Sequence, residues 1–461
     1  MELKYEKKDV YQSLDKKTLK KVDEYANGYI DFLNNAKTER LCVDVALDML
    51  NKAGFVDISK KDKLVPGDKI YFINKYKSLF IAVIGKKDLI KGVNIVGAHI
   101  DSPRIDLKPF PLYESAGMAL LKTQYYGGIK KYQWMSIPLA MYGVVYNEKG
   151  EKINISIGDN DDDPCFTITD LLPHLAKDQM KASASDFIDP EKMNILFGSI
   201  KDKEAKNNKI KSTVLNILNE KYGIKEIDFA RSDIEFVPAF KAKYIGIDKS
   251  MIGGYGQDDR VCAYATLKAM IDSVNENKEI STTMVAMIVD KEEIGSYGNT
   301  SMSTEAFDMF INKIIKKTGS KNVDKLELYY NSSMLSADVT AGINPNYEEV
   351  SDAQNANIIG CGVAVEKYGG ARGKSGGSEA NAEYISKVMK IFDKNKVGYQ
   401  LGTLGKVERG GGGTIAFILA NKGVDVVDCG TPVLSMHSPY EVTSKFDAYM
   451  TYLSYKAFFE E

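Results

Sequence analysis

Two short, nearly unbroken apolar runs, each followed by polar residues, constrain this chain most. The runs are 92–98 (GVNIVGA) and 283–289 (TMVAMIV). A continuous apolar run, rather than an alternating one, is typical of a strand that is buried on both faces. Strands of this kind occur mainly where helices cover both sides of a sheet, so the two runs predict an α/β fold.

The neighbouring segments fit this interpretation. The runs at 69–74 (KIYFIN) and 78–85 (SLFIAVIG) have the composition of strands, and apolar residues at helical spacing predict a helix over 38–53. A further helix is expected over 304–317, whereas 414–419 (TIAFIL) fits either a strand or a continued helix. We therefore expect a mixed, mostly buried β-sheet that is flanked by helices.

The middle of the chain has a different character. It contains charge-rich turns, an acidic run at 159–163 and an amphipathic helix near 212–218. The two apolar runs lie on either side of it, and a length of 461 residues favours two or three compact units. We interpret 1–107 and 242–461 as one catalytic domain and 108–241 as a smaller, inserted domain.

Composition excludes several classes of protein. Lys and Arg total 61 against 63 for Asp and Glu, so the chain lacks the overall basicity of a dedicated nucleic-acid binder. Its N-terminal segment is charged without the apolar core of a secretory signal, and no apolar stretch is long enough to predict a membrane span. The five cysteines are scattered without a CxxC pair, which favours a reducing cytoplasm over a disulfide framework.

Residues capable of metal chemistry follow both apolar runs. His99 and Asp101 follow the first run, and side chains two apart on an extended backbone project the same way, so the carboxylate could orient a metal-bound imidazole. Glu292 and Glu293 follow the second run and should point in opposite directions, so that one could bind a metal while the other acts as a general base. Each pattern alone also fits an ordinary capping residue or a solvated acidic pair.

Three further segments add candidate ligands, which are Asp258 in QDDR, Asp338 in SADV and His437 in MHSP. A two-metal hydrolytic site needs metals ~3.5–4 Å apart, usually linked by a carboxylate, with positions left open for water and substrate. Two histidines, one bridging carboxylate and two terminal carboxylates would complete such a site.

The ordered set HIDSPR, QDDR, DKEEIGS, SADV and MHSPYE resembles the ligand motifs of the aspartyl aminopeptidase family of metallopeptidases. The segments GKVERGGGGT and LLPHLAKDQ also resemble that family, and the similarity extends over essentially the whole chain. The resemblance implies a catalytic α/β domain that carries an inserted dimerisation domain. It also implies two divalent metals, with zinc expected and cobalt or manganese as alternatives.

The resemblance assigns roles to individual residues. Five would be metal ligands, with His99 and Asp338 on one metal, Glu293 and His437 on the other, and Asp258 bridging both. Glu292 matches the family's general base, and Asp101 matches the carboxylate that orients the first histidine. The implied substrates are peptides that lose an acidic N-terminal residue, and similar proteins assemble from dimers into closed dodecamers.

The chain departs from the family pattern in three places. The stretch 339–345 lacks two histidines, Asp259 replaces an asparagine, and Asp178 stands near the position of a histidine. Since the metal ligands are unaffected, the departures bear on substrate selectivity rather than on peptidase activity.

Three residues are candidates for substrate binding. An acidic substrate side chain needs a cationic partner, and Lys367 and Arg372 lie in a glycine-rich stretch that could supply one, although a solvated basic loop is an equal alternative. His174 could either pack at the start of a helix or reach the pocket of a neighbouring subunit.

Two other functions remain open from the sequence. One is a related two-metal aminopeptidase or deacylase of neutral or broad specificity. The other is a non-enzymatic oligomeric shell, against which the presence of Glu292 argues, because a scaffold has no use for a general base.

Overall fold

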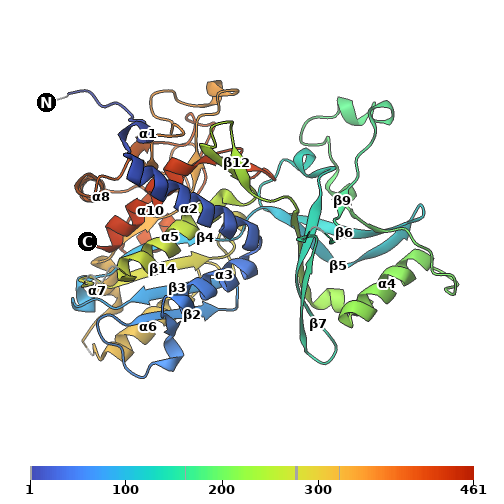
Figure 1. Cartoon of the computed structure of the whole chain (residues 1–461), viewed down its shortest axis with the longest axis horizontal. Coiled ribbons are helices and arrows are strands. Elements are labelled where there is room, and N and C mark those ends of the chain that lie inside the picture. The colour runs from blue at the N-terminus through green and yellow to red at the C-terminus, as the bar shows by residue number, and fades with distance from the viewer. Residues whose placement is uncertain (1–2, 161, 276–278, 321) are drawn as a thin grey trace. The chain divides into compact units, whose positions relative to one another are not determined.

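The computed structural model describes residues 3–160, 162–275, 279–320 and 322–461, and the chain divides into two compact units. Unit 1 contains the residues up to Asp101, 242–436 and 440–461, and unit 2 contains 102–241 with 437–439. Unit 2 therefore begins at Ser102, and the expected boundary at 107/108 falls inside strand β5 (Arg104–Ser115). In Figure 1, unit 1 carries the labels β2, β3, β4 and β14, and unit 2 carries β5, β6, β7 and β9.

Unit 1 is built on a mixed sheet whose inner strands are parallel. In spatial order the strands are β1 (Val56–Asp57), β2 (Lys69–Asn74), β3 (Ser78–Val83), β14 (Met284–Val289), β4 (Asn94–His99), β15 (Ser333–Ser336), β19 (Asp425–Gly430), β17 (Val363–Glu366) and β18 (Tyr399–Gly402). Strands β14, β4, β15 and β19 pair in parallel, while β3 and β17 run antiparallel to their inner neighbours. The expected mixed α/β fold is confirmed.

Both faces of this sheet are buried, which explains the apolar runs. Along β14, Met284, Ala286 and Ile288 pack on one face, and Val285, Met287 and Val289 pack on the other. Helices α2 (Lys16–Asn35), α3 (Glu39–Lys52), α5 (Gln257–Asn275), α8 (Ala382–Lys394) and α10 (Lys445–Phe459) contribute buried residues to the first face. Helices α6 (Ala306–Thr318), α7 (Lys325–Tyr330) and α9 (Ala416–Ala420) contribute them to the second. Because α9 occupies the end of the ambiguous run 414–419, the helical alternative for that run is confirmed.

A smaller sheet in unit 1 has the strand order β12 (Lys243–Ile245), β13 (Met251–Gly254), β21 (Glu441–Ser444), β20 (Pro432–Leu434) and β16 (Thr340–Ala341). Strand β13 leads directly into α5, and β16 follows Asp338. A short helix α1 (Val10–Ser13) precedes α2.

Unit 2 is an antiparallel sheet with the strand order β8 (Lys152–Ile157), β7 (Leu139–Tyr146), β11 (Ser232–Pro238), β5, β6 (Met118–Tyr126), β10 (Ile195–Gly198) and β9 (Thr167–Ile168). Helix α4 (Lys209–Tyr222) covers the helical segment expected near 212–218 and ends at Gly223 in a left-handed conformation. The role of this unit in dimerisation stays a prediction.

Among the residues that the structure describes, no helix has both the length and the apolar character needed to cross a bilayer.

Candidate metal centre

The centre is built around His99, the last residue of β4, which is buried. Its Nδ1 lies 3.0 Å from the carbonyl oxygen of Asp101 and 3.4 Å from Oδ1 of the same residue. Since a carbonyl oxygen only accepts hydrogen bonds, Nδ1 carries a proton, and loss of the second ring proton would leave the lone pair of the imidazole on Nε2. Asp101 thereby fixes both the tautomer and the orientation that a metal-binding histidine requires.

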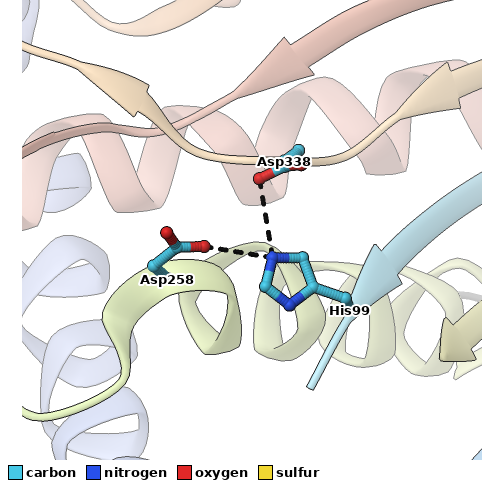
Figure 2. Close-up of side chains that lie close together, drawn as sticks. All are labelled: His99, Asp258 and Asp338. Atoms are coloured by element: carbon cyan, nitrogen blue, oxygen red, sulfur yellow. Dashed lines mark ion pairs between the residues drawn. The ribbon is translucent and has the colours of Figure 1, made fainter. Parts of the chain in front are cut away.

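Two carboxylates converge on Nε2 of His99, as Figure 2 shows. Oδ1 of Asp258 lies 3.0 Å from Nε2, and Oδ1 of Asp338 lies 3.7 Å from it. The three ligand atoms lie within 4.8 Å of one another. One imidazole nitrogen and carboxylate oxygens are a ligand set that zinc accepts, so these residues fit a divalent metal.

The first turn of α5 is irregular, and as a result two successive carboxylates contact different groups. Asp258 (φ -79°, ψ 107°) and Asp259 (φ -117°, ψ 32°) depart from helical geometry. Oδ2 of Asp259 accepts a hydrogen bond from the backbone N–H of His99 at 3.3 Å, while the Asp258 carboxylate faces the ring. The backbone N–H of Asp258 in turn donates to Oε2 of Glu441 at 3.0 Å. Sequence reasoning missed this role of Glu441, although the residue belongs to the MHSPYE motif.

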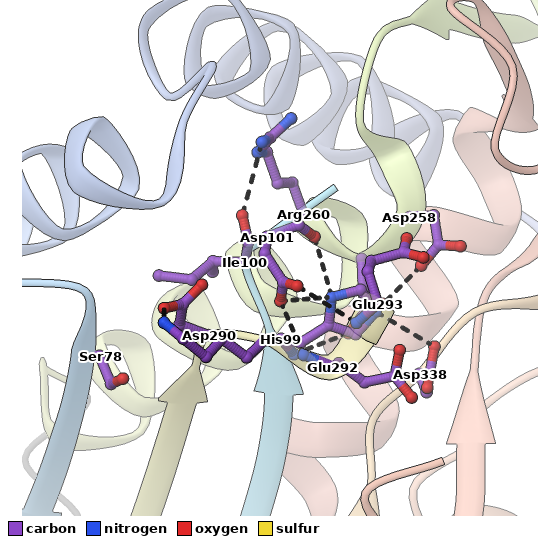
Figure 3. A network of polar contacts seen from close by, with 12 residues as sticks. Ser78, His99, Ile100, Asp101, Asp258, Arg260, Asp290, Glu292, Glu293 and Asp338 are labelled. Atoms are coloured by element: carbon purple, nitrogen blue, oxygen red, sulfur yellow. Dashed lines mark hydrogen bonds and ion pairs between the residues drawn. The ribbon is translucent and has the colours of Figure 1, made fainter. Parts of the chain in front are cut away.

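Glu292 and Glu293 follow β14 in a 3-10 turn, and Asp101 holds that turn. The backbone N–H of Glu292 donates to Oδ1 of Asp101 at 3.1 Å, and that of Glu293 donates to Oδ2 at 3.2 Å. Figure 3 shows these contacts beside His99, Asp258 and Asp338. The structure therefore brings together six of the expected site residues: His99, Asp101, Asp258, Glu292, Glu293 and Asp338.

The electrostatics of this cluster favour binding of a cation. Burial, followed by the negative charge of Asp338, raises the pKa of Glu292 to about 8, and His99 opposes this effect. Burial lowers the pKa of His99, but hydrogen bonds to Asp101, Asp258 and Asp338 outweigh it, so that the pKa lies well above its usual value. The negative field that holds a proton on this imidazole is also one that attracts a divalent cation.

His437 belongs to the stretch 437–439 that is grouped with unit 2. Its Nδ1 lies 2.8 Å from the carbonyl oxygen of Gly128, so this imidazole also carries its proton on Nδ1. A Cβ at Gly128 would lie 3.2 Å from that nitrogen, so even an alanine there would crowd the ring. The assignment of His437 as a metal ligand stays a prediction.

The substrate-binding candidates lie on exposed segments. Lys367 and Arg372 are exposed in the loop after β17, and Lys367 borders a surface depression of about 330 Å³ along α8. In the same loop, Lys374 lies 4.2 Å from the ring centroid of Tyr368, a contact that the sequence did not indicate. His174 is exposed in a 3-10 turn of unit 2 rather than packed at a helix start.

Comparison with known proteins shows similarity along nearly the whole chain. Residues 32–459 match the family described as Aminopeptidase I zinc metalloprotease (M18). A probable M18 family aminopeptidase 1 from Clostridium acetobutylicum is 46% identical over 98% of each chain, and one from Thermotoga maritima is 43% identical over 100% of each.

Solved structures agree with this similarity. The crystal structure of an M18 aminopeptidase from Thermotoga maritima has a TM-score of 0.95 at 42% identity, covering 99% of this chain and 100% of that one. The mApe1 dodecamer of S. cerevisiae shares the fold, with a TM-score of 0.76 at 22% identity and coverage of 95% of this chain and 96% of that one.

Proposed function

Because the chain belongs to the M18 family of metalloaminopeptidases, we propose that it removes acidic N-terminal residues, Asp or Glu, from peptides at a two-metal site. The observation that carries this proposal is the convergence of Asp258 and Asp338 on Nε2 of a buried His99. The negative charges of both aspartates also contribute to the raised pKa of Glu292. An ordinary capping aspartate or a solvated acidic pair would not explain why two carboxylates converge on one nitrogen of a buried imidazole.

In this proposal, His99 and Asp338 would hold one metal, Glu293 and His437 would hold the other, and Asp258 would be shared by both. The distances around Nε2 support the first metal, and the match of DKEEIGS and MHSPYE to the family motifs supports the second. Two divalent ions, zinc in our proposal, would polarise the scissile carbonyl and make water acidic enough to react near neutral pH.

Glu292 is the proposed general base. Its carboxylate would take a proton from the water that attacks the carbonyl carbon and deliver that proton to the amine nitrogen as the C–N bond breaks. Burial, followed by the negative charge of Asp338, raises the pKa of Glu292, and a raised pKa suits a group that must hold the proton it accepts until it returns it. Asp101 would act through His99 and the Glu292 turn rather than on the substrate.

We further propose that Lys367 or Arg372 pairs with the acidic substrate side chain, since both lie exposed on the glycine-rich loop. Unit 2 would form a dimer interface within a homo-oligomer, up to a dodecamer, and the exposed His174 could then reach a neighbouring subunit. Cytoplasmic location is consistent with five cysteines that form no disulfide.

The first experiment is release of the aromatic amine from Asp-, Glu- and Leu-anilides by purified protein, before and after chelation. Chelator-sensitive release that favours Asp or Glu supports the proposal. Chelator-sensitive release that favours Leu would still support metalloaminopeptidase activity but would contradict the acidic preference. No release from any of the three anilides, even with added zinc, cobalt or manganese, would contradict the proposed reaction and favour a binding shell.

A second experiment locates the acidic pocket. Lys367→Met and, separately, Arg372→Met should raise KM for Asp-anilide without changing KM for Leu-anilide, because the lost charge contacts only the acidic side chain. Lys60→Met, at an exposed lysine in another part of unit 1, is the matched control. If neither variant changes KM for Asp-anilide, the pocket lies elsewhere.

A further inference from the structure

We propose that Lys291 is a positioning residue for Glu292, acting through a bridge to Asp290 and Thr300 that we call the Lys291 brace. This inference rests on the proposed role of Glu292 as general base. Lys291 would not touch the substrate; it would hold the turn on which Glu292 is mounted.

The brace is a closed triangle of polar contacts at the end of β14. Nζ of Lys291 lies 2.8 Å from Oδ2 of Asp290 and 2.6 Å from Oγ1 of Thr300. The hydroxyl of Thr300 donates to the same Asp290 oxygen at 2.5 Å. Asp290 and Thr300 are buried, so these contacts are shielded from solvent and are worth more than exposed ones.

The backbone of Lys291 explains why such a tether is useful. Lys291 has a φ of 69°, a left-handed conformation that costs a non-glycine residue about 1 kcal/mol or more. Its carbonyl oxygen accepts from the N–H of Ser296 at 2.7 Å, which closes the turn that contains Glu292 and Glu293. With the chain reversed at this point, the N–H groups of both glutamates face Asp101.

The far end of the segment 290–300 is anchored beside Asp290 and Lys291 as well. The N–H of Asp290 donates to the carbonyl oxygen of Thr300 at 3.4 Å, and the hydroxyl of Ser78 on β3 donates to that oxygen as well. A Cβ at Gly298 would lie 3.0 Å from Cδ of Lys291, so the lysine stem crosses directly over this glycine. Both ends of the segment 290–300 therefore meet at the Lys291 ammonium.

Charge gives the ammonium a second effect. Asp290 is buried, and its carboxylate interacts unfavourably with those of Asp101 and Glu39, whereas Lys291 stabilises it. A neutral side chain at position 291 would remove the cation that offsets the repulsion between the carboxylates of Asp290 and Asp101. We expect Asp101 to lose its fixed position as a result, and with it the two hydrogen bonds that hold the glutamate turn.

The test is steady-state kinetics of Lys291→Met, which keeps the length of the stem and removes the charge. We expect kcat to fall by about tenfold or more, because a small misplacement of a catalytic group is costly, while KM changes by less than about twofold. Lys291→Arg should recover much of the lost kcat, because it restores a cation beside Asp290. The control is Lys249→Met, at an exposed lysine with a similarly left-handed φ of 55°, which should behave as wild type.

A kcat for Lys291→Met within about twofold of wild type would overturn the inference, and so would equal impairment of Lys291→Met and Lys291→Arg. If Lys291→Met does not fold, Thr300→Val removes one corner of the brace and should show the same fall in kcat at constant KM; an unchanged kcat there also overturns it. Glu292→Gln separates the two proposals. An active Glu292→Gln enzyme contradicts the assigned base, whereas an inactive one beside a normal Lys291→Met enzyme contradicts the brace alone.

Discussion

Oδ1 of Asp101 lies 3.4 Å from Nδ1 of His99, and both side chains are buried. The two Asp101 oxygens also accept the backbone N–H groups of Glu292 and Glu293. One carboxylate thus connects the strand end that carries His99, a proposed metal ligand, to the strand end that carries the proposed base.

We expect Asp101→Asn to lower metal affinity or kcat by about 10–100-fold, because an amide presents one NH₂ where a backbone N–H now finds an acceptor. Metal content after dialysis and kcat with added zinc would separate these two effects. Asp88→Asn, at a residue whose carboxylate caps a surface 3-10 turn, is the control. Wild-type values for both quantities in Asp101→Asn would show that Asp101 does not orient the centre.

Glu292→Gln should retain its metals and lose turnover by about 10²–10⁴-fold, since the amide keeps the shape of the side chain but cannot accept a proton from water. Metal analysis of the purified variant and kcat for Asp-anilide check this expectation. Glu305→Gln, at an exposed position just before α6, is the control. If Glu292→Gln keeps more than a few per cent of activity, another group is the base.

Gly430 packs closely against the backbone of Asp338, a proposed metal ligand. A Cβ at Gly430 would lie 1.7 Å from the carbonyl oxygen of Asp338, so Gly430→Ala must displace either the end of β19 or the segment that carries Asp338. We expect this variant to bind metal more weakly, as measured by titration against a competing chelator. Gly373→Ala, where a Cβ meets nothing within 4 Å, should bind metal as wild type does. Equal affinities would show that the segment at Asp338 relaxes without harm.

The strands that carry the site could be predicted from the sequence because β4 and β14 are buried on both faces, and strands buried in this way contain few polar residues. The polar residues that end those runs then stand out as His99, Asp101, Glu292 and Glu293. The family motifs added Asp258 and Asp338, which the structure places on Nε2 of His99.

Other features depend on backbone geometry that residue patterns do not reveal. The contact of Asp259 with the His99 N–H requires the irregular first turn of α5, and the Lys291 brace requires a left-handed residue that is not glycine. The run 414–419 could not be assigned as helix or strand, because Ile415 and Leu419 would be buried in either case; the structure buries them on the second face of the sheet.

We expect Asp447 of α10 to make the stability of unit 1 depend on pH. The backbone N–H groups of Gly360 and Gly362 donate to its carboxylate, at 2.7 Å each, but burial outweighs these bonds and raises the pKa of Asp447 to about 7. In the unfolded chain an aspartate has a pKa of about 3.9, so between these values the folded state binds more protons than the unfolded state. The stabilisation from this proton is complete below pH ~4 and is lost as the pH rises through ~7.

Asp447→Asn should therefore weaken the decline in unfolding free energy over this pH range, by up to about 1.4 kcal/mol per pH unit. The amide also loses one of the two hydrogen bonds, so we expect the variant to be less stable than wild type by about 1 kcal/mol at low pH and more stable than wild type above pH ~7, where wild type has lost the stabilisation from its proton. Denaturant unfolding of metal-free protein at several pH values, with the exposed Asp425→Asn as control, measures both effects. A slope identical to that of wild type would mean that Asp447 stays ionised in the folded chain throughout, and that the two glycine N–H groups outweigh its burial.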